Sequence, residues 1–468
     1  MATTFDRAPV PVAPPTGGVP LRRQVILASY WFGIYFLWGS FIAIVLPALL
    51  VPDQGAGLVP SSQKNSYLSI LETIGLIFPI VIQPAAGAFS DRLRTRWGRR
   101  RPLIASGAGA GVISLVLVGL APTFWLLLVA YCLLQISMNV SQGGYQGLLP
   151  DVVPGGERGE ASGFLGVGSL LGQVAGFAAA AALAPRTNVI LTAAVVGVTA
   201  FATCVFVKEQ PLARAAVTGP RQPRSVGRLI TELRGYLAEF GQYPDFCWVV
   251  ASRFFSYTGL ACIQRFAYNY LHDSYRSYRL DLGLTSVTLH GSRSATAIIF
   301  AIVVAFGLLA TYPAVKLSDR IGRRRVLVMA SVFGAVGSVA FFAAQSFTQV
   351  LFCAIPVGIA FGMLISVDWA FMADLAPRSR SGKFLGFSNI AAAGSQAFAP
   401  SLLGPVIDNI NNATNTTQGY SVLFVASAVF FLAGAAVLAR VRTEKIPEAD
   451  QPLDGAVGRA EYPATLAR

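Results

Sequence analysis

Long apolar segments recur along the whole chain, and they constrain its fold more than any other feature. A helix needs about 20 apolar residues to cross the hydrocarbon of a bilayer. The segments are continuous rather than short and alternating, which favours helices over the strands of a membrane barrel. Twelve spans are predicted, at residues 25–50, 66–90, 102–121, 124–150, 160–184, 189–208, 246–271, 294–317, 325–344, 348–374, 383–407 and 418–441.

The charge content indicates the same environment. Charged residues make up 12% of the 468 residues and hydrophobic residues 54%, whereas a soluble protein carries about 25% charged residues. So few charges cannot cover a surface that faces water. The sequence therefore predicts an all-α membrane protein.

The positive charges gather on one side of the predicted membrane. The net charge of +14 would also suit a nucleic-acid-binding protein, but most Lys and Arg lie in the tails and in alternate loops. The opposite loops hold Lys64, Arg186, Arg276, Arg279 and Arg293. Because short cationic loops stay in the cytoplasm, both termini are predicted to be cytosolic, in a multi-pass protein of the plasma (cytoplasmic, or cell inner) membrane. Anionic lipid is an expected contact, and nucleic acid is not.

The remaining segments complete the predicted organisation. Residues 1–24 lack the apolar core of a signal peptide and are interpreted as a disordered cytosolic tail. Residues 443–468 are interpreted as a second cytosolic tail. A polar linker at 209–245 separates six-helix bundles at 25–208 and 246–442. The five cysteines show no metal-ligand spacing and suit small buried hydrophobes, so neither a metal nor a cofactor is predicted.

Two charged loops repeat at an offset of about 224 residues. Ser90-Asp91-Arg92 and Gly98-Arg99-Arg100-Arg101 follow the second span, and Ser318-Asp319-Arg320 and Gly322-Arg323-Arg324-Arg325 follow the eighth. A second match, at offset 223, places Asp151, Pro154, Gly159 and Gly163 opposite Asp374, Pro377, Gly382 and Gly386. Tandem halves in one orientation are typical of parallel transporter repeats, whose substrate site lies near the midplane between the repeats.

These loops carry a family resemblance. Gly87-Ala-Phe-Ser-Asp91-Arg92, ending in Gly98-Arg99-Arg100, resembles the loop 2–3 signature of the major facilitator superfamily. The longer form, to Pro102-Leu-Ile, and the run from Arg253 to Asp273 resemble the sucrose-transporter and glycoside–pentoside–hexuronide branch. The resemblance implies the major facilitator fold, two pseudo-symmetric six-helix bundles around a cavity that opens alternately to each side. It also implies gating loops, formed by Gly87, Asp91, Arg92, Gly98, Arg99, Arg100, Asp319, Arg320, Gly322, Arg323 and Arg324.

Few ionisable residues fall inside the predicted spans. They are Glu72, Arg253, Arg265 and Asp368, and such residues are costly in a membrane and functional by default. A buried carboxylate beside an opposite charge can carry a proton. We predict that Asp368 pairs with Arg253 in proton coupling, with Glu72 as the other proton candidate. The alternative is a structural ion pair, or a side chain that reaches water from a helix end.

Neutral polar and aromatic residues gather on several spans. Placed beside flat rings, amide and hydroxyl groups suit an uncharged hydroxylated ligand such as a sugar. The alternative is that the rings belong to the membrane interface and that the amides join helices. The predicted substrate-binding residues are Trp31, Tyr35, Trp38, Asn139, Gln142, Tyr145, Gln173, Tyr257, Gln264, Trp369, Asn389 and Gln396. Gly168, Gly172 and Gly176 instead form a small-xxx-small seam for helix packing.

The function classes narrow accordingly. The sequence contains no Walker loop, H-E-x-x-H or G-x-S-x-G element, so neither an enzyme nor direct coupling to ATP is expected. The leading hypothesis is a monomeric secondary transporter that moves a sugar or glycoside by proton symport. Proton-driven efflux of an amphipathic compound and a transport-inactive membrane sensor stay open, because fold does not fix function.

Overall fold

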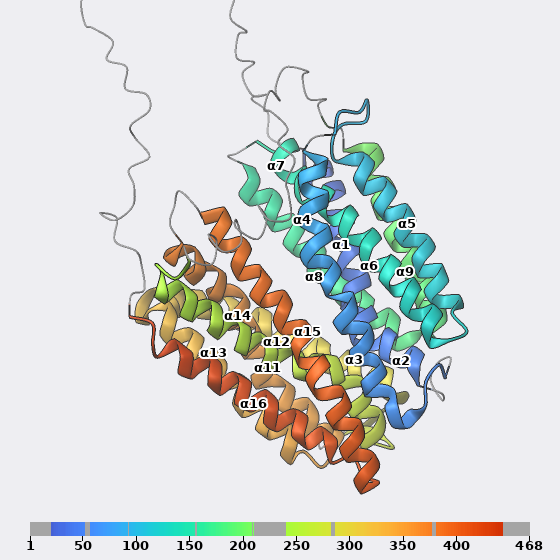
Figure 1. The fold of residues 1–468 in the computed structure, drawn as a ribbon, viewed down its shortest axis with the longest axis vertical. Coiled ribbons are helices and arrows are strands. Elements are labelled where there is room, and N and C mark those ends of the chain that lie inside the picture. Colours follow the sequence, from blue (N-terminus) through green and yellow to red (C-terminus); the bar gives the residue numbers. More distant parts are fainter. Residues whose placement is uncertain are drawn as a thin grey trace, which may run out of the picture. The chain divides into compact units, whose positions relative to one another are not determined.

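The computed structural model describes residues 20–51, 57–91, 93–154, 157–207, 209, 240–281, 286–376 and 381–442. Among these residues, 12 helices are long and apolar enough to cross a membrane, as the sequence predicts (Figure 1). Most of the two predicted tails and of the 209–245 linker lie outside the described residues, and so does Arg92 of the predicted gating loops.

The chain divides into two compact units, of which the first comprises Met1–Ser61 and Ile77–Gly219. Its first span is α1 (Leu21–Ser40), a π-helical turn η1 (Phe41–Val45) and α2 (Leu46–Leu50). The later helices of this unit are α4 (Ile77–Ser90), α5 (Arg101–Leu120), α6 (Phe124–Gln146), α7 (Leu148–Val152), α8 (Arg158–Ala182) and α9 (Pro185–Phe206).

Three glycines of α8 allow it to lie directly against α1. A Cβ atom on Gly168 would come within 2.9 Å of the carbonyl oxygen of Ala28, and one on Gly176 within 2.6 Å of that of Phe36. Gly172 faces the backbone of Phe32 in the same way. Such distances exclude any larger side chain, so the predicted packing seam is confirmed.

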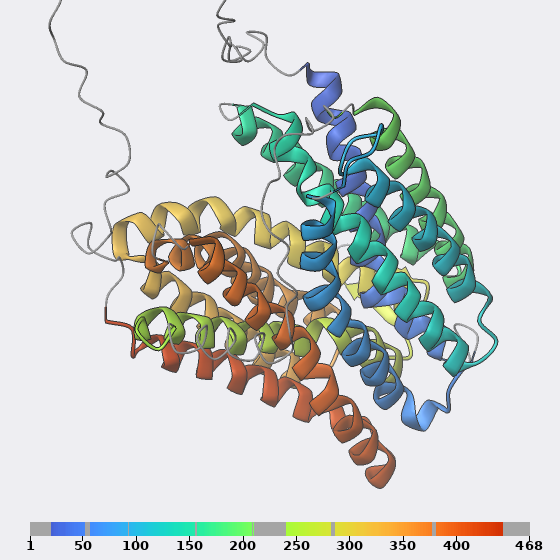
Figure 2. The same cartoon turned by 45° about the horizontal axis from the view of Figure 1, so that its top comes forward.

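The second unit comprises Ser62–Leu76 and Pro220–Arg468. Its helices are α3 (Lys64–Gly75), preceded by the 3-10 turn η2 (Ser61–Gln63), then α11 (Pro244–Ser274), α12 (Gly291–Ile321), α13 (Arg323–Ala343), α14 (Phe347–Leu375), α15 (Ser381–Thr414) and α16 (Gly419–Leu438). The predicted second span therefore divides near Leu76, and α3 packs on α15 (Figure 2). The predicted bundle 25–208 includes residues 62–76, whereas the packing groups them with the second unit.

A short β-hairpin occupies part of the segment between α11 and α12, where the sequence predicts no strand. β1 (Tyr278–Asp281) pairs antiparallel with β2 (Ser286–Leu289). The ring of Tyr278 lies 5.5 Å from that of Phe347, and the backbone N–H of Asp281 donates to Thr348 Oγ1 at 3.1 Å. The hairpin is thus fixed on the first turn of α14.

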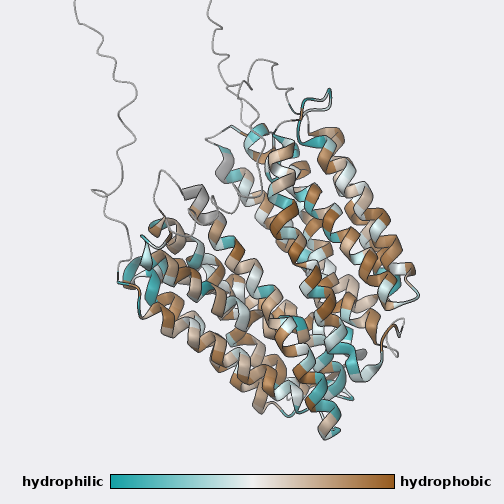
Figure 3. Ribbon diagram, viewed as in Figure 1, coloured by the Kyte–Doolittle hydropathy of each residue, from teal (hydrophilic) through white to brown (hydrophobic). Residues whose placement is uncertain are grey.

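Hydropathy follows the span boundaries in both units. Apolar residues dominate the middle of the helices, and polar residues gather toward their ends (Figure 3). Large apolar side chains such as Leu120, Phe201 and Leu309 are each 68% exposed. A surface of this kind requires an apolar solvent, and lipid supplies it.

Candidate functional site

Arg253 and Asp368 form a buried ion pair within the second unit. Arg253 lies on α11 and Asp368 on α14, and Arg253 Nε is 3.3 Å from Asp368 Oδ2. The two side chains are 7% and 4% exposed. The predicted proximity of the two residues is therefore confirmed.

Further groups surround the Arg253 guanidinium. Its Nη1 donates to Ser388 Oγ on α15 at 3.3 Å. Its central carbon lies 5.3 Å from the ring centroid of Tyr257 and 5.5 Å from that of Trp369, distances at which a cation is attracted to an aromatic face. Arg253 therefore keeps a hydroxyl and two rings when the negative charge of Asp368 is removed.

A second buried ion pair lies on the same helix. Arg265 Nε is 3.3 Å from Glu72 Oε2 of α3, and Glu72 is fully buried. Arg265 also donates through Nη2 to Gln396 Oε1 of α15 at 2.6 Å. Since Arg253 and Arg265 are 12 positions apart, the two pairs lie about 18 Å apart along α11. The sequence identified all four charges but did not assign Arg265 a partner.

Asp408 of α15 anchors the start of α3, a contact that the sequence reasoning missed. This carboxylate is buried and accepts hydrogen bonds from Ser66 N–H and Ser66 Oγ, both at 2.7 Å, and from Asn65 Nδ2 at 2.8 Å. A carboxylate at a helix N-terminus satisfies free N–H groups and favours the helix dipole. The interaction holds the polar end of α3 in the second unit.

An ion pair extends this polar cluster to α11 and α16. Lys64 contacts Asp273, and Asp273 also accepts a hydrogen bond from the Tyr420 hydroxyl at 2.7 Å. Asn269 Nδ2 donates to Asn65 Oδ1 at 2.8 Å. In the sequence, Lys64 and Asp273 look like ordinary charges at span ends, so only the packing reveals their role.

The charged loop of the first unit is a network of ion pairs. Arg100 Nη2 is 2.6 Å from Asp91 Oδ1, and Arg100 Nε is 2.8 Å from Asp151 Oδ2 at the end of α7. Arg99 binds Asp151 through both Nε, at 2.8 Å, and Nη2. Hydrogen bonding to Asp151 raises the pKa of Arg99 above its usual value. Gly87 contributes its carbonyl oxygen, 3.5 Å from Arg100 Nη1.

Glu209 completes this network, and the sequence reasoning did not select it. Its carboxylate accepts hydrogen bonds from the backbone N–H groups of Arg99 at 2.7 Å and of Arg100 and Arg101 at 2.9 Å. These groups lie at the N-terminus of α5, where a negative charge is stabilising. The only signal in the sequence was an acidic residue directly after the sixth span.

The equivalent loop of the second unit shares the geometry in part. Gly98 and Gly322 both have positive φ values, +96° and +92°. Arg323 Nε is 3.1 Å from Asp374 Oδ2, which repeats the contact of Arg99 with Asp151. Arg324 Nη1 instead donates to the Val441 carbonyl at 2.9 Å. Asp319 and Arg320 are exposed.

The predicted substrate residues of the first unit form one aromatic group. The ring of Trp31 lies 5.4 Å from the rings of Tyr35 and Tyr145. Asn139 donates to the Gln135 carbonyl of its own helix at 2.8 Å, which favours a structural role. The side chains of Trp38, Gln142 and Gln173 are only partly buried.

In the second unit the predicted substrate residues divide between the two ion pairs. Tyr257 and Trp369 flank Arg253, and Gln396 binds Arg265. Gln264 is partly buried and Asn389 is exposed. Trp369 is 45% exposed, so part of its side chain remains accessible beside Arg253.

Comparison with known proteins defines the family. The Major Facilitator Superfamily model matches residues 27–287 and 249–462, so the chain belongs to this superfamily and is a multi-pass membrane protein. Two curated relatives are each 30% identical: the multidrug resistance protein MdtG of Escherichia coli over 222 residues (44% of this chain, 51% of that protein) and the sucrose transport protein SUC4 of Arabidopsis thaliana over 196 residues (37% and 36%). The chain thus spans about half or less of the relatives it matches.

Solved structures support the same fold. A bacterial homologue of the human lysosomal transporter Spinster, inward-facing and unoccupied, aligns with a TM-score of 0.67 at 16% identity, covering 90% of this chain and 97% of that one. A POT family transporter in complex with 5-aminolevulinic acid aligns with a TM-score of 0.70 at 11% identity, covering 91% and 97%. At these identities the likeness establishes the major facilitator fold alone.

Proposed function

We propose that this transporter imports a sugar or glycoside by proton symport across the cytoplasmic membrane. The observation that carries the proposal is the buried pair of Arg253 and Asp368, which two aromatic side chains flank. The similarity to SUC4 over part of the chain favours the substrate class. The assignment of coupling residues and the choice of a sugar as substrate are both parts of this proposal.

Asp368 is the proposed proton carrier because its environment suits both charge states. Ionised, it neutralises Arg253. Protonated, it leaves Arg253 with Ser388 and two ring faces, which lower the cost of an unpaired buried cation. Proton uptake then weakens the contact between α11 and α14. Glu72 is the second candidate, because it is the other buried carboxylate that pairs with an arginine of α11.

The proposed substrate contacts come from aromatic faces and neutral polar groups. Trp31, Tyr35 and Tyr145 gather in the first unit, and Trp369 is partly exposed in the second. Ring faces cover the apolar face of a sugar, and hydroxyl or amide groups bind its hydroxyls. A net charge on the substrate is not needed to satisfy any of these groups.

The test is uptake of radiolabelled sucrose, maltose and related glycosides into proteoliposomes. An inward gradient of one pH unit supplies about 1.4 kcal/mol per proton, so one-proton symport should concentrate the sugar about tenfold. Asp368→Asn and Glu72→Gln mimic permanently protonated carboxylates. The variant at the coupling residue should lose accumulation but keep exchange of labelled for unlabelled sugar.

Asp281→Asn in the hairpin is the matched control, because it removes an aspartate charge outside both buried pairs. It should accumulate sugar like the unchanged protein. Retained exchange shows that a variant is folded and binds substrate. Gradient-stimulated uptake in both Asp368→Asn and Glu72→Gln would exclude these carboxylates as proton carriers.

Proton-driven efflux of an amphipathic compound is the second candidate, and the similarity to MdtG favours it. The same vesicles distinguish the two functions. Efflux requires no sugar uptake under either condition, together with gradient-dependent movement of a lipophilic cation or dye. That result would replace the sugar hypothesis.

A further inference from the structure

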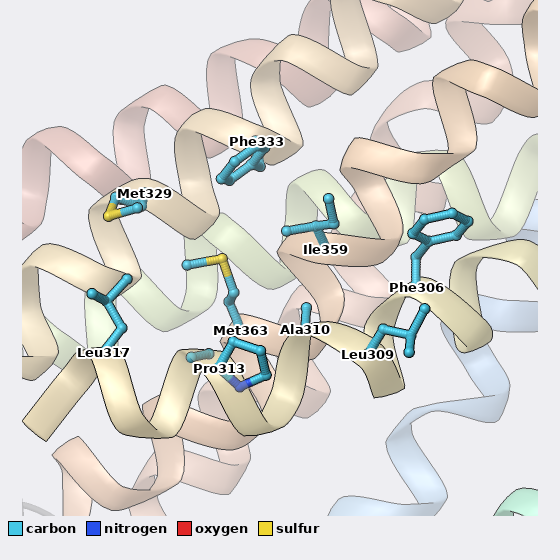
Figure 4. Close-up of a pocket in the computed structure, with 10 residues that line it drawn as sticks. Phe306, Leu309, Ala310, Pro313, Leu317, Met329, Phe333, Ile359 and Met363 are labelled. Carbon is cyan, nitrogen blue, oxygen red and sulfur yellow. The ribbon is translucent and has the colours of Figure 1, made fainter.

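A groove on the second unit lies between α12 and α13, with α14 as its floor (Figure 4). Its volume is about 390 Å³. Met329 and Phe333 line it from α13, Ile359 and Met363 from α14, and α12 contributes one face from Phe306 to Leu317. All these side chains are apolar, so the occupant is apolar where it touches the groove.

The groove exists because α12 presents small side chains at its centre. Ala310, Pro313 and Ala314 lie there, between the larger Phe306 and Leu317. Leu309, at the rim, is 68% exposed. The groove therefore opens to the lipid-facing surface of the unit.

The length of the groove matches one leaflet of a bilayer. Phe306 and Leu317 are eleven positions apart, which is about 16 Å along a helix, and half of a hydrocarbon core measures about 15 Å. Lipid acyl chains are the apolar molecules that surround every lipid-facing surface. One acyl chain lying along α12 would cover the groove from end to end.

Basic residues mark one end of the groove. Arg320 follows Leu317 by three positions and Arg325 precedes Met329 by four, spacings that place residues on the same helix face. Both arginines are exposed, whereas Arg323 is paired with Asp374. Within residues 316–325, Asp319 is the only acidic residue. This end therefore favours an anionic group.

We propose that the groove binds an anionic phospholipid, with an acyl chain along α12 and the phosphate between Arg320 and Arg325. The predicted orientation places this end of the groove in the cytosolic leaflet, which carries the anionic lipids. Basic pockets between membrane helices bind such head groups. The site is separate from the buried ion pairs of α11 and does not depend on the transported substrate.

Native mass spectrometry of the detergent-solubilised full chain tests the site. The probes are phosphatidylglycerol and phosphatidylcholine with identical acyl chains. The unchanged protein should retain phosphatidylglycerol in preference to phosphatidylcholine. Ala310→Phe fills the groove and should weaken phosphatidylglycerol binding about tenfold or more. Arg325→Gln removes one charge, and at about 1 kcal/mol per basic residue it should weaken binding about fivefold.

Two control variants match these changes. Val336→Phe adds the same ring on the exposed surface of α13 outside the groove, and Arg96→Gln removes an exposed arginine of the other charged loop. Both should bind phosphatidylglycerol as the unchanged protein does. Arg325 is exposed, so Arg325→Gln tests the proposal even if Ala310→Phe does not fold.

Three results would overturn the proposal. Equal retention of the two lipids would remove the role of charge. Wild-type binding by a folded Ala310→Phe would remove the groove as the site. Displacement of phosphatidylglycerol by an equal concentration of inorganic phosphate would show that the acyl chain contributes nothing.

Discussion

The charged loop after α4 and the charged loop after α12 share a sequence but differ in the groups that hold them. In the first unit Asp91 and Asp151 pair with the side chains of Arg99 and Arg100. Glu209 accepts hydrogen bonds from the backbone N–H groups of the same two arginines. In the second unit, among the described residues, Asp374 is the carboxylate that pairs with this loop. Arg324 binds carbonyl groups instead.

The difference shows that repetition of a motif conserves positions but not partners. The left-handed glycine and the contact of its following arginine with an aspartate recur in both units. The additional acids are supplied by the surroundings. We therefore expect the contacts of the loop after α4 to contribute more to the free energy of unfolding than those of the loop after α12. We also expect the loop after α12 to present free basic groups to the membrane surface.

Replacing the left-handed glycines should have the largest effect. A non-glycine residue at such φ values costs about 1–3 kcal/mol. At Gly98 a Cβ atom would also lie 2.7 Å from Glu209 Cβ and displace the carboxylate from α5. Gly98→Ala should lower the free energy of unfolding by about 3 kcal/mol and Gly322→Ala by about 2 kcal/mol. Denaturant unfolding in detergent measures both, and a larger loss for Gly322→Ala would reverse the comparison.

Neutralising the recurring aspartates should have an intermediate effect. Asp151 accepts from two arginines, whereas Asp374 binds Arg323 through one 3.1 Å contact. Hydrogen bonds to charged groups contribute about 1.5–3 kcal/mol, less where water screens them. We expect losses of about 2 kcal/mol for Asp151→Asn and about 1 kcal/mol for Asp374→Asn. Thermal unfolding of the two variants side by side checks this, and equal losses would contradict the asymmetry.

Replacing Asp91, which follows α4, or Asp319, which lies near the end of α12, should have the smallest effect on stability. Asp91 contacts Arg100 at 2.6 Å, but its side chain is 55% exposed. Such pairs contribute about 0–1 kcal/mol and weaken with salt. Asp91→Asn should cost a few tenths of a kcal/mol at low salt and almost nothing at 1 M salt. Asp319→Asn should be neutral at both, and a salt-dependent loss there would reveal a partner for Asp319.

The buried charges show how far sequence reasoning reached. Glu72, Arg253, Arg265 and Asp368 stand out because an ionisable residue in an apolar run is costly without a partner. The pairing of Arg253 with Asp368 was predicted on that ground and is confirmed. The partner of Arg265 was not predicted, because periodicity does not reveal which helix faces α11 at a given depth.

The network at the start of α3 marks the limit of that reasoning. Lys64, Asn65, Asp273 and Asp408 lie at the ends of spans, where polar residues are common and give no signal by themselves. Their hydrogen bonds join positions more than 200 residues apart. The β-hairpin was missed for a related reason, since two four-residue strands are too short to produce a recognisable alternation.

The sequence by itself determined the solvent, the number of membrane helices and the internal repeat. Each of these follows from local composition, because a helix in lipid must satisfy its own backbone and present an apolar surface. The tertiary structure decided which carboxylate meets Arg265, which helix the glycines of α8 lie against and where a groove stays open. Those features depend on side chains from distant segments that approach within a few ångströms, and only packing sets that approach.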